Sequence, residues 1–140
     1  MSTRSRIGMV NEDGSITSVY CHWDGYPSHN GVLLLGNYKD REKIEMLLSL
    51  GDLSSLAPKI APEGNSVHTF DSPADGVCVF YGRDRKEKGT ECIVSANLQE
   101  FIQMSDWCDY LYIFEAGEWF LITMYKDKKP EKLSEYFYEE

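Results

Sequence analysis

The stretch from Tyr20 to Asn30 limits most strongly how this chain can fold. It contains three aromatic rings, two imidazoles and one carboxylate, together with Gly25 and Pro27, which interrupt helix and strand. Such a segment cannot bury all of its rings on one face of a regular element. We therefore expect its rings either to close one end of the core or to line a pocket, and the sequence leaves both alternatives open.

The rest of the chain is predicted to form one domain, residues 1–140, around this stretch. With 140 residues, 42% of them hydrophobic, it is long enough to close a single core. No window reaches the length of a membrane span, and residues 1–6 lack the apolar core of a signal peptide, so we expect a cytoplasmic protein that does not bind membranes. Four scattered cysteines without a Cys-x-x-Cys pair favour reduced, mostly buried thiols.

The charge balance disfavours nucleic acid as a partner. The formal net charge is −9, from 23 acidic and 14 basic residues. A nucleic-acid backbone repels such a surface, so we expect no direct binding to DNA or RNA. An acidic surface can instead meet a basic partner, including a protein whose nucleic-acid groove it imitates, or it can serve solubility alone.

Local patterns predict an α+β fold. Hairpins are expected at 5–10 with 16–22, around Asp13-Gly14, and at 110–115 with 118–125, around Ala116-Gly117. Amphipathic helices are expected at 40–51 and at 98–105. The run 32–35 weakly favours helix, and 130–140 fits a short helix with Pro130 in its first turn.

The middle of the chain has weaker patterns. Residues 52–75 are expected to form a long connection with one helical turn at 53–56, and 76–81 a strand that pairs with 90–94 across a charged turn at 82–89. Together the segments predict a single α+β domain with a mainly antiparallel sheet, built from hairpins and covered by two to three helices.

Catalytic patterns are weak. His22 and Asp24 share one face of an extended segment, which leaves a metal-assisted hydrolase as one alternative. Cys21 and His22 point to opposite faces and cannot act as nucleophile and base. The sequence contains no nucleophile elbow, phosphate loop or His-Glu-x-x-His motif. We therefore expect no enzyme, metal or cofactor.

A ligand pocket would use more of the same residues. Aromatic faces could stack on a base, polar groups could bind its edge, and guanidinium groups could bind phosphate if they converge on the aromatic stretch. The other interpretation is that the arginines are solvated or pair with nearby carboxylates. The candidate ligand-binding residues are Arg6, Tyr20, His22, Trp23, Asp24, Tyr26, Asn30, Arg83 and Arg85.

An interaction surface is the third possibility. Carboxylates around the last hairpin and at the C-terminus, with Tyr and Phe between them, could form an acidic stripe suited to a basic groove. For any single carboxylate, a solvated side chain is the more frequent state. The candidate residues are Asp106, Asp109, Glu115, Glu118, Glu135 and Glu139.

Several motifs give the chain a family resemblance. At 5–8, 11–15, 30–31 and above all Cys21-His22-Trp23-Asp24-Gly25-Tyr26-Pro27, it resembles a family of small proteins encoded by bacteriophages and prophages. The likeness continues through 47–53 and, more loosely, 81–85 and 117–119. It implies a phage or mobile-element product that acts inside a bacterial cell, where small acidic proteins of this kind resemble inhibitors of host defence. No catalytic or ligand residue is transferred from this resemblance.

These observations lead to three hypotheses. The first is a phage accessory protein that inhibits a bacterial defence system by non-catalytic binding to a host effector protein, as an acidic mimic of nucleic acid in one version. The second is a sponge that sequesters a nucleotide second messenger in an aromatic and arginine pocket. The third is a small metal-assisted hydrolase that uses His22 and Asp24. Self-association into a homo-oligomer stays open under each.

Overall fold

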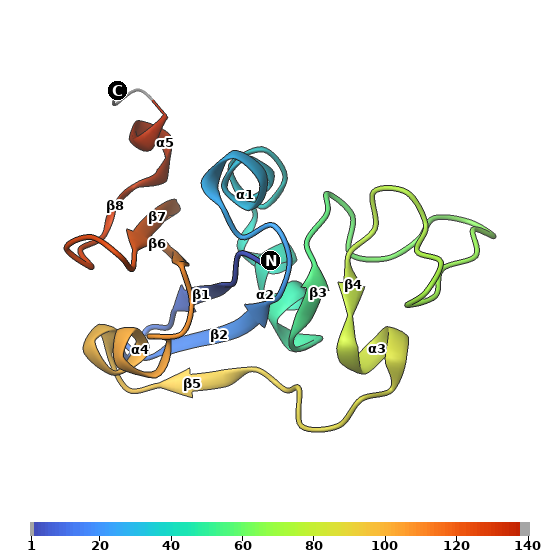
Figure 1. Ribbon diagram of the computed structural model, residues 1–140, viewed down its shortest axis with the longest axis horizontal. Coiled ribbons are helices and arrows are strands. Elements are labelled where there is room, and N and C mark those ends of the chain that lie inside the picture. The colour runs from blue at the N-terminus through green and yellow to red at the C-terminus, as the bar shows by residue number, and fades with distance from the viewer. Residues whose placement is uncertain (1, 138–140) are drawn as a thin grey trace.

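Two hairpins form the centre of the sheet in the computed structural model, which describes residues 2–137 (Figure 1). β1 (Ser5–Val10) and β2 (Ile16–Cys21) pair antiparallel, as do β6 (Tyr110–Glu115) and β7 (Glu118–Thr123). Ala116 and Gly117 both have positive φ, 53° and 80°, which is the turn geometry that matches strand twist in a two-residue hairpin. Both predicted hairpins are confirmed.

The hairpins are joined by a pairing that the local patterns do not reveal. β1 runs parallel to β6, with Ile7 opposite Tyr112, and β3 (Leu53–Ser55) runs parallel to β2 at Cys21. β4 (Val79–Phe80) and β8 (Glu131–Lys132) extend the two ends, giving the order β4-β3-β2-β1-β6-β7-β8. The structure is therefore one α+β domain with a mixed sheet.

Three segment predictions are wrong. Residues 53–55 form a strand instead of a helical turn, because Leu53 takes a place beside β2 in the core. β5 (Ile93–Ser95) pairs with β2, where Thr17 lies opposite Val94, and not with the strand at 79–80. Figure 1 shows β5 running along the outer side of β2. The charged segment expected to be a turn contains a short helix, α3 (Tyr81–Arg85).

Helices cover both faces of the sheet. On one face, α1 (Val32–Asn37), α2 (Arg41–Ser49) and α5 (Leu133–Tyr136) pack against Ile7, Val19 and Tyr112. Asp40 caps α2 by accepting a hydrogen bond from the Glu42 amide, as its sequence position predicts. Pro130 lies before β8, so the C-terminal helix begins later than predicted.

The second face has its own, smaller core. α4 (Leu98–Met104) places Phe101 against Ile16, Leu111 and Ile122. Leu111 and Ile113 face this core while Tyr112 and Phe114 face the larger one, because successive side chains of a strand alternate between faces. Within residues 2–137, no helix has the length and apolar character needed to cross a membrane.

Candidate functional site

The Tyr20–Asn30 stretch is fixed at the end of β2 by its backbone. Gly25 donates to the Thr3 carbonyl at 2.9 Å, and its own carbonyl accepts from the Tyr112 hydroxyl at 2.6 Å. A Cβ at position 25 would lie 2.8 Å from the Thr3 oxygen, so this close approach requires glycine. A π-helical turn, η1 (Pro27–Gly31), then carries the chain into α1.

One side of the stretch belongs to the core. The Asn30 side chain is fully buried and donates to the Ser5 hydroxyl and, at 3.5 Å, to the Cys21 sulfur. Its oxygen lies 2.9 Å from Nδ1 of His29. Burial raises the pKa of Cys21 to about 12 and keeps its thiol protonated. Asn30 and Cys21 therefore anchor the stretch and are not open to a ligand.

The other side presents a continuous row of rings to solvent. Trp107, Tyr20, His22 and Trp23 follow one another, with centroid separations of 4.7, 5.9 and 4.6 Å, and are called here the aromatic row. The Tyr20 hydroxyl lies 2.5 Å from Nδ1 of His22. Trp23 and Trp107 end the row, with 45% and 47% of their surface exposed. Exposed tryptophans packed on partly buried rings are typical of contact surfaces.

The row has a defined electrostatic surrounding. Burial, and then the nearby charge of Arg4, lower the pKa of His22 and favour its neutral form. Burial raises the pKa of Tyr20 to about 12. Asp106 and Asp109 flank Trp107 in the sequence and are exposed, and the Asp109 carboxylate accepts from the Arg4 amide at 3.1 Å. The row is therefore bordered by the charge of Arg4 near His22 and by carboxylates near Trp107.

Tyr26 and Asp24 lie on the same stretch, beyond the row. The Tyr26 hydroxyl donates to the Asp24 carboxylate at 3.3 Å, and its ring meets the edge of His29 at 6.0 Å. Asp24 has a φ of 55°, which turns the chain away from β2. Tyr26 is 38% exposed and adds a further ring to the surface.

The three candidate arginines do not converge on this surface. Arg6 lies opposite Tyr20 on β1 but is buried, donates from Nε and Nη2 to Ser18, and has its pKa lowered by burial. Arg83 in α3 donates to the carbonyls of Ile60 and Cys78 and to Asp84. Arg85 is exposed, 5.0 Å from the ring of Phe70 and 3.9 Å from Glu87.

Sequence patterns gave no sign of a buried charged cluster at His68, Asp84 and Arg83. His68 Nδ1 accepts from the Ala74 amide at 3.0 Å, and Nε2 lies 3.3 Å from the Asp84 carboxylate. Burial alone would raise the pKa of Asp84, but hydrogen bonds from Arg83 and the Phe80 amide outweigh it and leave that pKa lowered. Both imidazole nitrogens are engaged, so the cluster holds the long segment before β4 in place.

His22 and Asp24, the residues of the hydrolase hypothesis, each have another partner. His22 bonds Tyr20, and Asp24 bonds Tyr26. Across the part of the chain that the structure describes, no group of three or more His, Cys, Asp or Glu side chains could hold a metal ion.

The predicted acidic stripe is divided. Asp106 and Asp109 precede β6 and border the aromatic row, whereas Glu115 and Glu118 face each other at the opposite end of that strand. Glu118 pairs with Lys132 at 3.8 Å, and Glu135 is exposed on α5. Glu139 lies outside the described residues. Comparison of the chain with protein-family models, curated proteins and solved structures found no match.

Proposed function

We propose that this chain is a non-catalytic binding protein that inhibits a bacterial defence effector by engaging it through the aromatic row. The observation that supports the proposal best is the row itself, whose two terminal tryptophans are each about half exposed. Tryptophan and tyrosine often supply most of the binding free energy at protein interfaces. The rings are already packed against one another, so little side-chain entropy is lost when a partner covers them.

A protein partner suits this surface better than a nucleotide. A nucleotide needs several cationic donors for its phosphates, and Arg4 is the arginine whose charge lies beside the row. Arg6 and Arg83 are occupied by groups of the chain itself. The exposed carboxylates of Asp106 and Asp109 border the row and would repel a phosphate. These carboxylates, and the net charge of −9 on the whole chain, favour a basic surface on the partner.

The biological setting comes from the resemblance to phage and prophage proteins. In that setting the partner is a host defence protein, and a basic nucleic-acid groove is the surface whose charge complements this chain. The two other hypotheses, nucleotide sequestration and hydrolysis, give different results in the same experiment.

Affinity capture from bacterial cells tests the proposal. The wild-type chain, the double variant Trp23→Ala/Trp107→Ala and the control Met46→Ala are used as baits, since Met46 is a similarly exposed apolar residue on α2. Proteins and small molecules in each eluate are identified by mass spectrometry. We expect one host protein with the wild type and the control, and its loss with the double variant. A nucleotide eluting without any protein, or nucleotide turnover abolished by His22→Ala, would contradict the proposal.

A further inference from the structure

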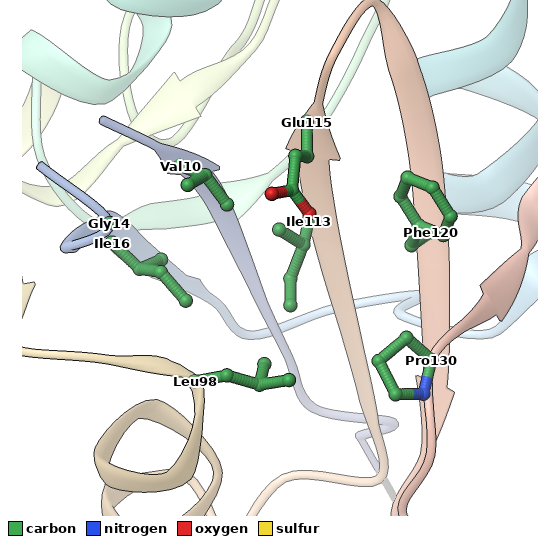
Figure 2. A pocket seen from close by; sticks show the side chains of 8 residues that line it. All are labelled: Val10, Gly14, Ile16, Leu98, Ile113, Glu115, Phe120 and Pro130. Atoms are coloured by element: carbon green, nitrogen blue, oxygen red, sulfur yellow. The ribbon is translucent and has the colours of Figure 1, made fainter. Parts of the chain in front are cut away.

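A second concavity lies on the sheet face that carries Tyr20, at the other end of β2. Its lining residues come from β1, β2, β6 and β7 and from the segments around Leu98 and Pro130, and Figure 2 shows their side chains around one space. Val10 pairs with Ile16, and Ile113 pairs with Phe120, so the floor crosses β2, β1, β6 and β7. Leu98 at the start of α4 and Pro130 before β8 form its sides. We call this concavity the groove.

The groove is apolar because α4 covers only part of this face. Phe101 of α4 packs over Ile16, Leu111 and Ile122, and the remaining surface between Leu98 and Phe120 is left open. Leu98 is the first residue of α4, and its side chain points toward the sheet face in Figure 2. It is nevertheless 37% exposed, because no other side chain covers it fully. Burial of such apolar surface by a partner lowers the free energy and so favours binding.

One carboxylate lies at the rim. Glu115 ends β6, and Figure 2 shows its oxygens beside Ile113. Its side chain forms no hydrogen bond or ion pair with any residue from 2 to 137, although Lys126, Lys128 and Lys129 precede Pro130 in the sequence. Its neighbour across the hairpin, Glu118, is paired with Lys132. The groove thus combines apolar walls with one unneutralised negative charge, which is complementary to a cation.

The size of the groove selects the kind of occupant. Its volume is about 270 Å³. Pockets that enclose whole small-molecule ligands usually measure about 300–1,000 Å³, so this groove is near the lower end of that range and has room for one or two side chains. Anchoring of a single apolar side chain in a shallow pocket is a common mode of peptide recognition.

We infer that the groove binds a segment of a partner protein in which an apolar side chain enters the cavity and a neighbouring Lys or Arg pairs with Glu115. The inference rests on the proposed function only in that the occupant is a protein. Ile16 and Tyr20 are on the same face of β2, roughly 13 Å apart along the strand. One partner could therefore contact both the groove and the aromatic row.

A titration followed by NMR tests the groove directly, with acetyl-Phe-Arg-amide as the probe at millimolar concentration. We expect amide shift changes centred on Val10, Ile113 and Phe120. Acetyl-Phe-Glu-amide, which keeps the ring and reverses the charge, should bind more weakly. In Glu115→Gln the affinity should fall by up to about fivefold, as for loss of one exposed ion pair, whereas the matched variant Glu118→Gln should bind like the wild type.

Several results would overturn the inference. These are the absence of shifts in the groove, equal binding of the Arg and Glu peptides, or equal effects of Glu115→Gln and Glu118→Gln. Binding of phenethylammonium without binding of the peptide would assign the groove to a small amine instead. Trp23→Ala/Trp107→Ala should leave the groove shifts unchanged, so a failure of the aromatic-row proposal is detected separately.

Discussion

Trp107 packs its indole against Tyr20, with 4.7 Å between the ring centroids and 48° between the ring planes. This contact joins two surfaces that are far apart in the sequence, the aromatic stretch after β2 and the acidic segment before β6. Because Trp107 lies between Asp106 and Asp109, the contact also gives the aromatic row its carboxylate border. The predictions below test how these rings are held and what they do.

The three tryptophans should separate into structural and surface residues. Trp119 is 4% exposed, donates to the Tyr38 carbonyl at 2.8 Å and packs on Phe114. Trp119→Ala should therefore lower the free energy of unfolding by about 3–5 kcal/mol. Trp23→Ala and Trp107→Ala should each cost about 1 kcal/mol or less. Urea unfolding checks this order, and a loss at Trp23 as large as that at Trp119 would place Trp23 in the core.

Replacing either of two glycines with alanine should change the unfolding free energy, in opposite directions for the two positions. Gly25→Ala would bring a Cβ within 2.8 Å of the Thr3 oxygen, so we expect a loss of about 1–3 kcal/mol in unfolding free energy. Gly36 lies in α1 with no atom within 4 Å of the added Cβ, and Gly36→Ala should gain about 0.5–1 kcal/mol. Chemical denaturation of both variants measures the difference. Equal effects would mean that the stretch is not held against Thr3 as described.

His22 should make stability depend on pH. Its pKa in the folded chain is lowered from 6.5, first by burial and then by Arg4, so the unfolded chain binds more protons there. Its contribution is fully present above pH 6.5 and is lost as the pH falls through the lowered folded pKa. An NMR titration should give a His22 pKa below 6.5 that rises in Arg4→Gln. A wild-type value at or above 6.5 would show that the ring is not desolvated.

A buried hydroxyl offers a gain in stability. Thr123 is 3% exposed, and its hydroxyl has no hydrogen-bond partner among the described residues. Thr123→Val keeps the shape and should raise the unfolding free energy by about 1 kcal/mol. In the control Thr17→Val, the lost hydroxyl accepts from Asn11 at 2.9 Å, so a decrease of about 0.5–1.5 kcal/mol is expected. A decrease for both variants would indicate that Thr123 does have a partner.

Local signals predicted the elements that depend on local chemistry. The Asp13-Gly14 and Ala116-Gly117 turns fixed both hairpins, and Asp40 marked the start of α2. Strand partners could not be predicted in the same way, because the parallel pairing of β1 with β6 depends on side chains far apart in the chain. β3 has three residues, which is too few to show a period.

Only the part of the candidate site that lies in one stretch of sequence was predicted. Tyr20, His22 and Trp23 were identified from the density of rings in one stretch, and they do share a surface. Trp107 was missed, since nothing local shows which ring it meets, although a tryptophan between two aspartates is a sign of exposure. Arg6 was expected to be available for a ligand, but its side chain is buried on the sheet and donates to Ser18 on the neighbouring strand.

The affinity of the captured partner for the wild-type chain and for Trp23→Ala/Trp107→Ala, measured by calorimetry, tests the central claim most directly. If the aromatic row is the contact surface, the double variant should bind about 30-fold more weakly or worse, equivalent to about 2 kcal/mol, while Met46→Ala binds normally. Unchanged affinity in a folded double variant would contradict the account.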